Sequence, residues 1–392
     1  MARVVVAGAS MAGLRAAETV AKQGFRGDIV VVGAESAMPY NRPPLSKGQL
    51  AEPAALAFRI PPVAADVRWR LNTAVVAADL DNRRVTLTGG EQLGFDGLVV
   101  ATGLRPRRLA LPGPERGRHV LRNYADAREL YAAIGPGCRL VIVGAGFIGC
   151  EVATTARDLG ADVVVVGQRG TPSERPLGAL VGAELQRRHE SRGVRFRLGV
   201  QPVELRGEDR VRSVLLSDGS ELPADVLVEA IGCVPNVEWL AGNGLDLSDG
   251  VRCDNLLRVQ GRPGVVACGD VARFPNPLID SIPRRVEHWT MATDTARRAG
   301  ASLAGWLAGA EPSAAPFVPL PSFWSDQCGI RVQAIGAVGL AEDSTVLEGN
   351  LEAEAVIGYH RAGRLIGVVL LGMAGRQLHY RQLLANQPAT TG

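Results

Sequence analysis

Val4-Val5-Val6-Ala7-Gly8-Ala9-Ser10-Met11-Ala12-Gly13 is the segment of this chain that most strongly indicates its fold. An apolar run ends in a glycine-rich turn and continues into residues 14–20, whose composition favours a helix. Strand, turn and helix in this order open a dinucleotide-binding βαβ unit, in which the helix N-terminus faces the phosphates. Gly8 makes the tight turn, Ser10 takes the place of the middle glycine, and Gly13 packs the helix against the strand.

The residues after this turn support the same interpretation. Asp28–Val32 has the apolar pattern of a second strand, and Glu35 follows it. A carboxylate at this point can accept hydrogen bonds from the ribose of an adenosine. An ordinary glycine-rich turn followed by a surface glutamate is the alternative.

The opening pattern occurs a second time, at Leu140–Glu151, and leads to another strand over Asp162–Val166. This copy has all three glycines, Gly144, Gly146 and Gly149. Two such units are far more specific than one, because they imply two dinucleotides that face each other. We expect one to be a bound flavin and the other a nicotinamide coenzyme.

The end of the second copy bears on the choice of coenzyme. An NADH-specific site has Asp or Glu after this strand, whereas here Gly167 is followed by Gln168 and Arg169. A carboxylate repels a 2′-phosphate and an arginine pairs with it, so we expect NADPH to be accepted at least as well as NADH. In the alternative, Arg169 points to solvent and Gln168 serves NADH. Glu151, early in the helix, either caps it or contacts the nicotinamide end of the coenzyme.

Composition excludes several functional classes. The chain has 392 residues, 46% hydrophobic and 21% charged, and its longest apolar stretch, 365–375, is too short for a membrane helix. The first strand is entered by Arg3, which leaves no room for a signal peptide, so we expect a cytoplasmic protein. Six cysteines without metal-ligand spacing predict reduced structural thiols and no metal site. A net charge of +3 with dispersed basic residues does not indicate nucleic-acid binding.

The proline-rich segment at residues 40–47 contains an unusual residue choice. Of 43 basic residues in the chain, only Lys22 and Lys47 are lysines. Lys47 ends the sequence Tyr-Asn-Arg-Pro-Pro-Leu-Ser-Lys, in which two prolines stiffen the backbone ahead of a compact amine. We interpret Lys47 as selected for its shape, and we expect it to pair with a buried carboxylate.

Two later segments also predict ligand contacts. An apolar strand ends at Gly269-Asp270, where Asp270 can accept hydrogen bonds from polyol hydroxyls. The run Glu287-His288-Trp289 opens a helix that reaches about Leu307, and its positive N-terminal end suits a ligand that becomes anionic on reduction. The aromatic pair Phe323-Trp324 favours interface packing, with a ligand wall as the alternative.

We predict an α/β protein with two Rossmann-like dinucleotide-binding domains in a glutathione-reductase-like arrangement and a small α+β C-terminal domain. Apolar runs predict a short helix near 46–50, a last helix from about 376, and strands at 74–79, 84–87, 93–100, 195–198, 203–205, 211–217, 225–229, 331–335, 354–359 and 365–370. Proline-dense linkers near 104–114 and 311–321 separate the parts. The predicted FAD-binding domain comprises 1–111 and 232–310, the NAD(P)-binding domain 112–231, and the C-terminal interface domain 311–392.

Together these residues resemble the oxygenase-coupled NAD(P)H-dependent ferredoxin reductases, the putidaredoxin reductase family, over nearly the whole chain. The motifs that carry the resemblance are the paired turns, RPPLSK at 42–47, ATG at 101–103, GD at 269–270, EHW at 287–289 and FWSDQ at 323–327. The resemblance implies that NAD(P)H gives a hydride to FAD, which passes electrons singly to an iron–sulfur ferredoxin.

The resemblance also implies roles for individual residues. Lys47 would approach the reactive nitrogen of the isoalloxazine and act in catalysis with Trp289, and Trp324 would face the partner. Flavin-binding positions, besides Gly8, Ser10 and Gly13, are Ala12, Glu35, Arg42, Lys47, Val75, Arg122, Asp270 and Trp289. Coenzyme-binding positions are Gly144, Gly146, Gly149, Glu151, Gln168 and Arg169.

The chain departs from this family at a few positions. Met291 stands where relatives usually have asparagine, Pro321-Ser322 precedes FWSDQ in place of Pro-Trp, and the acidic coenzyme residue is absent at Gly167. The chain has neither a CxxxxC motif nor a cysteine in the 40s segment, so electrons must leave from the flavin itself. The alternatives to a ferredoxin reductase are a flavin oxidoreductase that reduces a quinone or dioxygen, and a redox-sensing interaction protein of the apoptosis-inducing-factor type.

Overall fold

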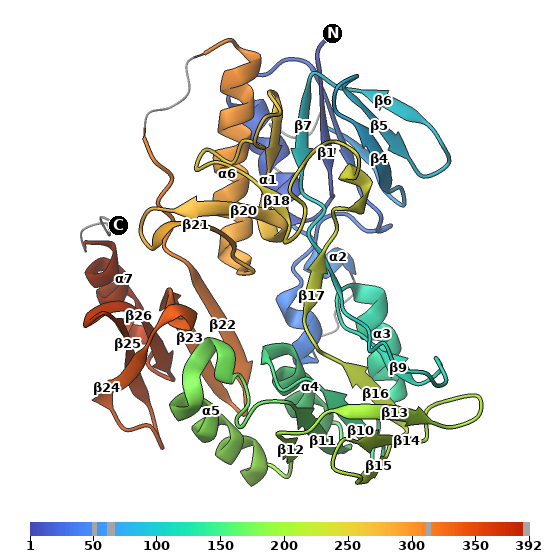
Figure 1. Ribbon diagram of the computed structural model, residues 1–392, viewed down its shortest axis with the longest axis vertical. Coiled ribbons are helices and arrows are strands. Elements are labelled where there is room, and N and C mark those ends of the chain that lie inside the picture. The colour runs from blue at the N-terminus through green and yellow to red at the C-terminus, as the bar shows by residue number, and fades with distance from the viewer. Residues whose placement is uncertain (49–52, 61–66, 311–314, 387–392) are drawn as a thin grey trace.

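The computed structural model describes residues 1–48, 53–60, 67–310 and 315–386. It consists of an upper part built on the first dinucleotide turn, a lower part built on the second, and a C-terminal sheet beside the lower part (Figure 1). The α/β fold class predicted from the sequence is confirmed. The domain boundaries given above remain predictions.

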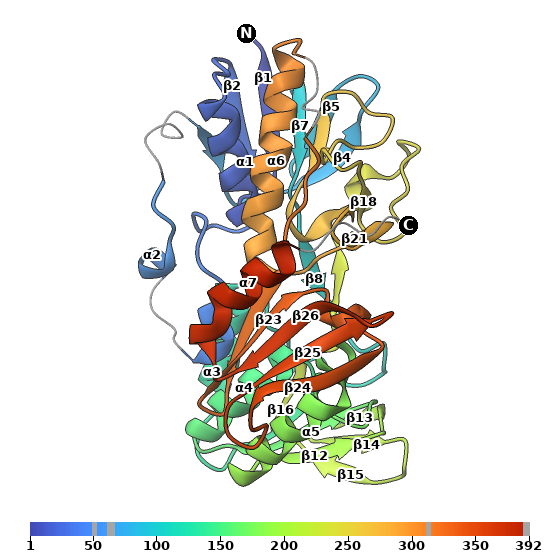
Figure 2. The same ribbon diagram turned by 90° about the vertical axis from the view of Figure 1, so that its left-hand side faces the viewer.

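The upper part contains a five-stranded parallel sheet around the first turn. Its strands, in spatial order, are β19 (Val265–Ala267), β7 (Gly97–Val100), β1 (Arg3–Ala7), β2 (Asp28–Val32) and β3 (Arg68–Arg70). Helices α1 (Met11–Lys22) and α6 (Trp289–Leu307) pack side by side on one face (Figure 2). Across the sheet lie β4 (Val75–Asp79), β5 (Arg84–Leu87) and β6 (Gln92–Gly94), and a small sheet is formed by β18 (Val251–Arg252), β20 (Ala272–Asn276) and β21 (Asp280–Arg285).

The lower part repeats the same topology. Its parallel sheet has the order β12 (Arg195–Leu198), β11 (Asp162–Gly167), β10 (Arg139–Val143), β16 (Val226–Glu229) and β9 (Arg118–His119). Helices α3 (Tyr124–Ala133), α4 (Phe147–Asp158) and α5 (Glu174–Ser191) accompany it, with an antiparallel sheet of β13 (Pro202–Arg206), β14 (Ser213–Leu216) and β15 (Glu221–Pro223). Apolar residues dominate the central strands of both parallel sheets, as burial on two faces requires.

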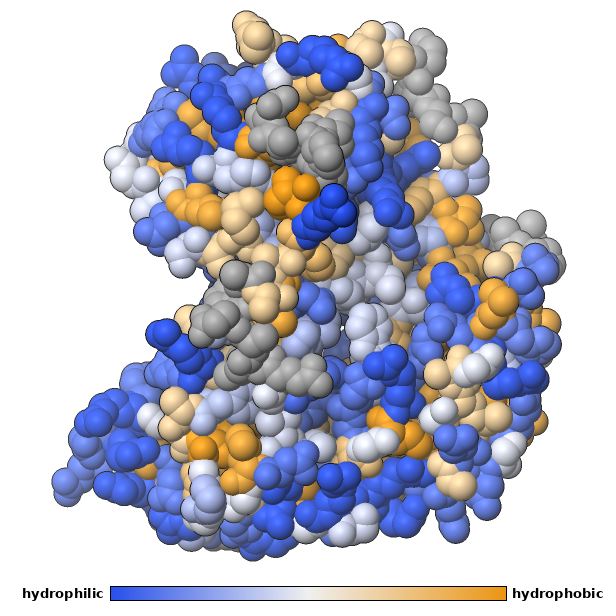
Figure 3. Space-filling model, turned by 180° about the vertical axis from the view of Figure 1, so that it is seen from behind, coloured by the Kyte–Doolittle hydropathy of each residue, from blue (hydrophilic) through white to orange (hydrophobic). Residues whose placement is uncertain are grey.

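A two-stranded antiparallel ribbon joins the two parts. It pairs β8 (Leu104–Pro106), where the chain leaves the upper part, with β17 (Cys233–Pro235), where it returns. Between the parts the molecular surface is hollowed (Figure 3). The carboxyl ends of both parallel sheets, where such folds bind their ligands, carry the two glycine turns.

The C-terminal part is a five-stranded antiparallel sheet with one helix. The strand order is β22 (Ser322–Gln327), β23 (Ile330–Gly336), β26 (Arg364–Leu371), β25 (Ala355–Arg361) and β24 (Asp343–Gly349). Helix α7 (Gln377–Ala385) lies across this sheet (Figure 2), where Tyr380 and Leu384 bury their side chains against it. Strand β22, which contains the FWSDQ motif, lies beside α4 of the lower part.

Two predicted elements differ in the structure. The expected strand 93–100 is two strands, because Asp96 exchanges hydrogen bonds with the backbone of Arg3 and turns the chain from β6 into β7. The expected helix near 46–50 is instead a 3₁₀ turn over Pro43–Lys47 that ends at Gly48, with φ of 68°. Residues 49 and 50 lie outside the described residues, and the short helix α2 (Pro53–Leu56) follows them in the chain.

Among the described residues, no helix is long and apolar enough to cross a bilayer. Within the same residues there is no cluster of three His, Cys, Asp or Glu side chains that could hold a metal ion.

Candidate active site

The first turn has the backbone geometry that a bound pyrophosphate requires. Gly8 has φ of 121°, and a Cβ there would lie 2.1 Å from the carbonyl oxygen of Ala101. A Cβ at Gly13 would lie 1.8 Å from the carbonyl oxygen of Gly8, so only glycine lets α1 approach β1 this closely. Ser10 has φ of −110°, an extended conformation open to any residue, which explains why serine is tolerated at the middle position.

The second turn has the same geometry. Gly144 has φ of 116°, and Cβ atoms at Gly144 and Gly149 would lie 2.2 Å and 2.0 Å from backbone oxygens. Gly146 corresponds to Ser10 and has no atom within 4 Å of its Cβ position. Neither α1 nor α4 has a side-chain cap, so the first N–H groups of both helices remain available for phosphate oxygens. Both turns therefore fit a dinucleotide.

Four of the predicted flavin-binding residues meet at the first turn. Arg42 forms an ion pair with Glu35, and it donates to Ser10 Oγ at 3.3 Å and to the carbonyl oxygen of Arg122 at 2.8 Å. Tyr40 donates its hydroxyl to Glu35 Oε2 at 2.6 Å, and burial raises the pKa of Tyr40 to about 12. The Glu35 carboxylate is thereby held at the end of β2, where a ribose would lie.

Further predicted flavin-binding residues lie beside the loop after β19 and at the start of β4. Gly269 has φ of 71°, and its Cβ position lies 2.9 Å from the Cβ of Ala12, which brings the loop after β19 close to the first turn. The neighbouring Asp270 faces Arg122 at 3.4 Å between Oδ2 and Nη2. Val75 begins β4 and is half-buried opposite Leu87.

A buried ion pair joins the two dinucleotide units. Lys47 Nζ lies 2.8 Å from Glu151 Oε2, and the two side chains are only 16% and 4% exposed. Ser46 also donates to Oε2, and Ser325 from β22 donates to Oε1 at 2.6 Å. The prediction that Lys47 pairs with a buried carboxylate is confirmed. Glu151 lies one turn inside α4 and does not cap that helix, so the capping alternative is wrong.

The backbone around Lys47 is fixed from the lower part. Thr155 of α4 donates to the carbonyl oxygen of Ser46 at 3.0 Å, and Tyr131 of α3 donates to that of Leu45 at 2.9 Å. A Cβ at Gly48 would lie 2.7 Å from Thr155 Cγ2. The 3₁₀ turn is thus held against α4, and the ammonium of Lys47 has little freedom to leave the carboxylate.

Two family descriptions match the chain. "Pyridine nucleotide-disulphide oxidoreductase" matches residues 2–296 and "Reductase C-terminal" matches residues 322–391. The chain belongs to the pyridine nucleotide-disulphide oxidoreductase family. The family description and the names of the relatives imply a flavin and NAD(H) as cofactors.

Individual relatives of this oxidoreductase are ferredoxin reductases by name. The chain is 36% identical to the probable ferredoxin reductase CtmF of Castellaniella defragrans, over 97% of this chain and 94% of the relative. It is 38% identical to the ferredoxin–NAD(+) reductase component of the p-cumate 2,3-dioxygenase system of Pseudomonas putida, over 86% and 81%. The crystal structure of the covalent putidaredoxin reductase–putidaredoxin complex matches with a TM-score of 0.89 and 30% identity, over 98% and 93%. The resemblance inferred from the motifs is confirmed.

The second dinucleotide unit of this oxidoreductase places an arginine where the first has a glutamate. The backbone N–H groups of Thr73 and Asn72 donate to the carbonyl oxygens of Gly33 and Glu35. Equivalent bonds run from Val200 and Gly199 to Gly167 and Arg169. Arg169 is therefore the structural counterpart of Glu35. Its side chain is exposed and forms no ion pair within the described part of the chain, while Gln168 donates to Gln201 Oε1 at 2.8 Å.

The two tryptophans lie on neighbouring segments. Trp289 is the first residue of α6, half-buried, with its ring centroid 6.1 Å from that of Phe58. Trp324 is half-buried in β22, opposite Gln333. Thr290 donates to the carbonyl oxygen of Ser322 at 2.8 Å, which ties the start of α6 to the start of β22.

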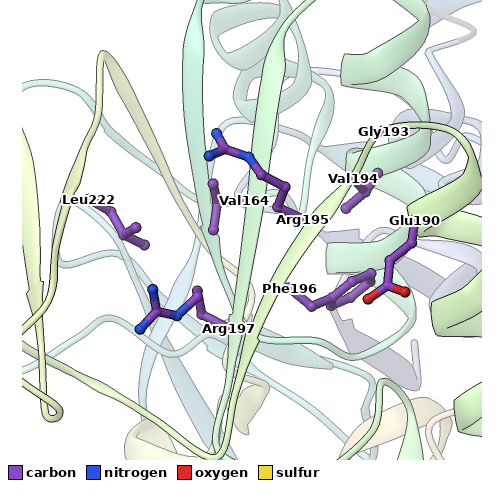
Figure 4. A pocket seen from close by; sticks show the side chains of 8 residues that line it. All are labelled: Val164, Glu190, Gly193, Val194, Arg195, Phe196, Arg197 and Leu222. Atoms are coloured by element: carbon purple, nitrogen blue, oxygen red, sulfur yellow. The ribbon is translucent and has the colours of Figure 1, made fainter.

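A pocket of about 520 Å³ is lined by residues outside both glycine turns. It opens at the edge strand β12 and is lined by Val164, Glu190, Gly193, Val194, Arg195, Phe196, Arg197 and Leu222 (Figure 4). None of the predicted site residues is among them, so this pocket does not belong to the candidate active site.

Ser46, Ser325 and Thr155 were not predicted from the sequence. Ser46 and Ser325 lie inside the motifs RPPLSK and FWSDQ, so their place in those motifs was the available signal. The sequence contained no comparable signal for Thr155, which contacts the site only because α4 packs on the 3₁₀ turn.

Proposed function

We propose that this protein passes electrons from NAD(P)H through non-covalently bound FAD to a small iron–sulfur ferredoxin that supplies an oxygenase. The observation that carries this proposal is the buried Lys47–Glu151 pair between the two dinucleotide turns. The names of the relatives and the putidaredoxin complex support a ferredoxin as the acceptor. We also propose the division into 1–111 with 232–310, 112–231 and 311–392.

When bound, the flavin would take up two electrons with a hydride and release them singly. The residues of the chain position the reactants and stabilise charge. Lys47 supplies a fixed cation, and its pairing with Glu151 prevents its side chain from rotating toward solvent. The uncapped start of α6 adds positive potential beside Trp289. Glu35 and Asp270 would accept hydrogen bonds from hydroxyl groups of the flavin nucleotide.

The properties of the cysteine thiols support electron transfer directly from the flavin edge. All six cysteines are free, and burial raises the pKa of the Cys150, Cys253 and Cys268 thiols. Such thiols are poor nucleophiles at neutral pH. A carrier that takes one electron at a time therefore fits this chain better than a disulfide substrate.

Anaerobic stopped-flow measurements test the proposal. The purified protein should be yellow and release FAD on acid precipitation, and NADH or NADPH should bleach the flavin before a ferredoxin re-oxidises it. Rapid turnover with a quinone or dioxygen alone would favour the small-acceptor oxidoreductase. A long-lived charge-transfer complex with a change of oligomeric state would favour the redox sensor. Release of FMN, or flavin retained in the pellet, would contradict the cofactor assignment.

We further propose that NADPH is used at least as well as NADH. Arg169 supports this, because it stands at the counterpart of Glu35, to which we assign ribose binding, and a guanidinium there would pair with a 2′-phosphate. Arg169→Glu should shift the ratio of kcat/KM toward NADH by about tenfold or more, since a charge-assisted pair contributes ~1.5–3 kcal/mol. Arg195→Ala, which removes an arginine paired with Asp162 on the same sheet, is the matched control. An unchanged ratio in Arg169→Glu would place the 2′-phosphate elsewhere.

A further inference from the structure

Strand β22 presents different chemistry on its two faces. Successive side chains of a strand alternate, so Phe323, Ser325 and Gln327 share one face, and Trp324 and Asp326 the other. Ser325 and Gln327 are 0% and 1% exposed, whereas Asp326 is half-exposed and pairs with Arg331. The first face is thus committed to the interior of the molecule.

This inner face of β22 contacts one side of helix α4. Phe147, Glu151 and Thr154 lie on one side of the helix at spacings of four and three residues. Phe323 packs on Phe147 with 4.9 Å between ring centroids, Ser325 donates to Glu151, and the N–H of Cys328 donates to Thr154 Oγ1 at 3.3 Å. The C-terminal sheet therefore contacts the helix that carries Glu151 along its length.

A chain of buried hydrogen bonds continues behind Ser325. Gln327 Nε2 donates to Ser325 Oγ at 3.1 Å, and Gln327 Oε1 lies 2.8 Å from His189 Nε2 on α5. The His189 side chain is fully buried, and burial lowers its pKa, so the ring is neutral. These hydrogen bonds connect Lys47 and Glu151 to α5 through strand β22.

The direction of these hydrogen bonds follows from which atoms can donate and which can only accept. An ionised carboxylate only accepts, so the single hydroxyl hydrogen of Ser325 goes to Glu151. Ser325 Oγ must then accept from the amide nitrogen of Gln327, which turns the amide oxygen toward His189. His189 therefore carries its hydrogen on Nε2. Each of the three side chains, His189, Gln327 and Ser325, therefore donates its hydrogen bond in the direction of the Glu151 carboxylate.

We propose that Ser325, oriented by Gln327 and His189, is a positioning residue that holds Glu151 so that its other oxygen fixes Lys47. The C-terminal sheet would then complete the flavin site as well as face a partner. This inference rests on the proposed function, because it assigns Lys47 a role toward the flavin. It requires that loss of the Ser325 hydroxyl affect flavin reduction only through Lys47.

The test compares Ser325→Ala with Asp326→Asn, which changes the neighbouring residue on the opposite face of β22. Flavin content, thermal unfolding, the midpoint potential of the flavin and anaerobic reduction by coenzyme are measured for each. Ser325→Ala should slow flavin reduction by about threefold to tenfold, because a small displacement of a charged group is costly. The coenzyme Kd should stay constant and the midpoint potential should become more negative. Asp326→Asn should behave as wild type.

A double-mutant cycle with Lys47→Met decides whether Ser325 acts through Lys47. In the Lys47→Met background, Ser325→Ala should cause no further slowing, because coupled residues are not additive. Equal slowing in both backgrounds, or an unchanged rate in Ser325→Ala, would overturn the proposal. If Ser325→Ala fails to fold, Ser325→Cys keeps the side-chain volume with a weaker donor and is judged by the same two criteria. A wild type that binds no flavin would instead refute the proposed function.

Discussion

At the scale of single residues, the site depends on one lysine in a chain that otherwise uses arginine. The Lys47 ammonium meets Glu151 Oε2 at 2.8 Å and Pro43 O at 3.4 Å, a compact arrangement that a planar guanidinium cannot reproduce. Removing one partner of a buried pair leaves an uncompensated charge, which costs about 3–5 kcal/mol. Loss of either partner should therefore affect both the activity and the stability of the protein.

Lys47→Met should retain FAD but slow hydride transfer by about tenfold or more, equal to ~1.4 kcal/mol of barrier. The protein should also lose thermal stability, because Glu151 remains buried without its cation. Single-turnover reduction of the flavin measures the rate. Lys22→Met is the matched control, since Lys22 also pairs with a glutamate, Glu18 of α1, but its own side chain is exposed. Unchanged reduction by Lys47→Met would leave the lysine with a structural role alone.

His288 predicts a pH dependence of stability. Burial lowers the pKa of His288 to about 4, its Nδ1 has no partner among the described residues, and its ring lies 4.8 Å from that of Phe323. Between pH 6.5 and about 4 the unfolded state binds the proton and the folded state does not, so stability falls on acidification, by up to roughly 3 kcal/mol. Above pH 6.5 this group adds no pH dependence.

His288→Phe keeps an aromatic ring against Phe323 and removes the titration. The melting temperature of this variant should fall less between pH 6.5 and pH 4.5 than that of the wild type. His379→Phe replaces an exposed histidine and should reproduce the wild-type slope. Identical slopes in all three proteins would show that His288 does not stay neutral in the fold. Part of the slope should remain, because burial also lowers the pKa of His189 and His119.

At the scale of elements, the two strand–turn–helix units share one backbone design. In each, the first glycine adopts positive φ against a neighbouring loop, and the last glycine lets the helix contact the turn. The middle position has negative φ in both units, so it accepts Gly146 in one and Ser10 in the other. This difference has no steric cost.

Alanine at the last glycine of each turn should show which ligand that turn binds. In Gly149→Ala the new Cβ would lie 2.0 Å from the carbonyl oxygen of Gly144, so α4 must shift. The KM for coenzyme should rise by about tenfold or more while flavin content stays constant. Gly13→Ala should instead lose flavin. Gly146→Ser, which copies Ser10, should retain both ligands, and loss of coenzyme binding in that variant would contradict the equivalence of the turns.

At the scale of the whole molecule, three parts of the chain meet at one carboxylate. Lys47 and Ser46 come from the upper part, Glu151 from the lower part and Ser325 from the C-terminal sheet. The ribbon of β8 and β17 and the contact of β22 with α4 hold these parts around the hollow between them (Figures 1 and 3). The arrangement leaves the segments of Trp289 and Trp324 adjacent.

Alanine at Trp289 or Trp324 should impair ferredoxin reduction at least about fivefold more than ferricyanide reduction, because large aromatic residues dominate docking surfaces. Ferricyanide is a small acceptor that needs no docked surface. Steady-state rates with both acceptors check this, and Trp306→Ala, at the far end of α6, is the control. Equal losses with the two acceptors would show that the tryptophans act on the flavin rather than on the partner.

Features that depend on neighbouring residues could be predicted from the sequence. The two glycine turns, helix α6 to Leu307 and strand β12 followed from local spacing and composition, because φ, ψ and burial periodicity are set within a few residues. Lys47 was found by the rarity of lysine. The break between β6 and β7 was missed, because the hydrogen bonds from Asp96 reach back to Arg3.

Which distant residues meet depends on how the elements pack in the folded protein. That Glu151 is the partner of Lys47, and that Ser325 holds it, depends on how α4, the 3₁₀ turn and β22 pack together, and no local pattern encodes this. The correspondence of Arg169 with Glu35 likewise emerged from matched backbone hydrogen bonds, not from residue identity. Local spacing specifies an element, whereas the chemistry of this site depends on contacts between elements far apart in the chain.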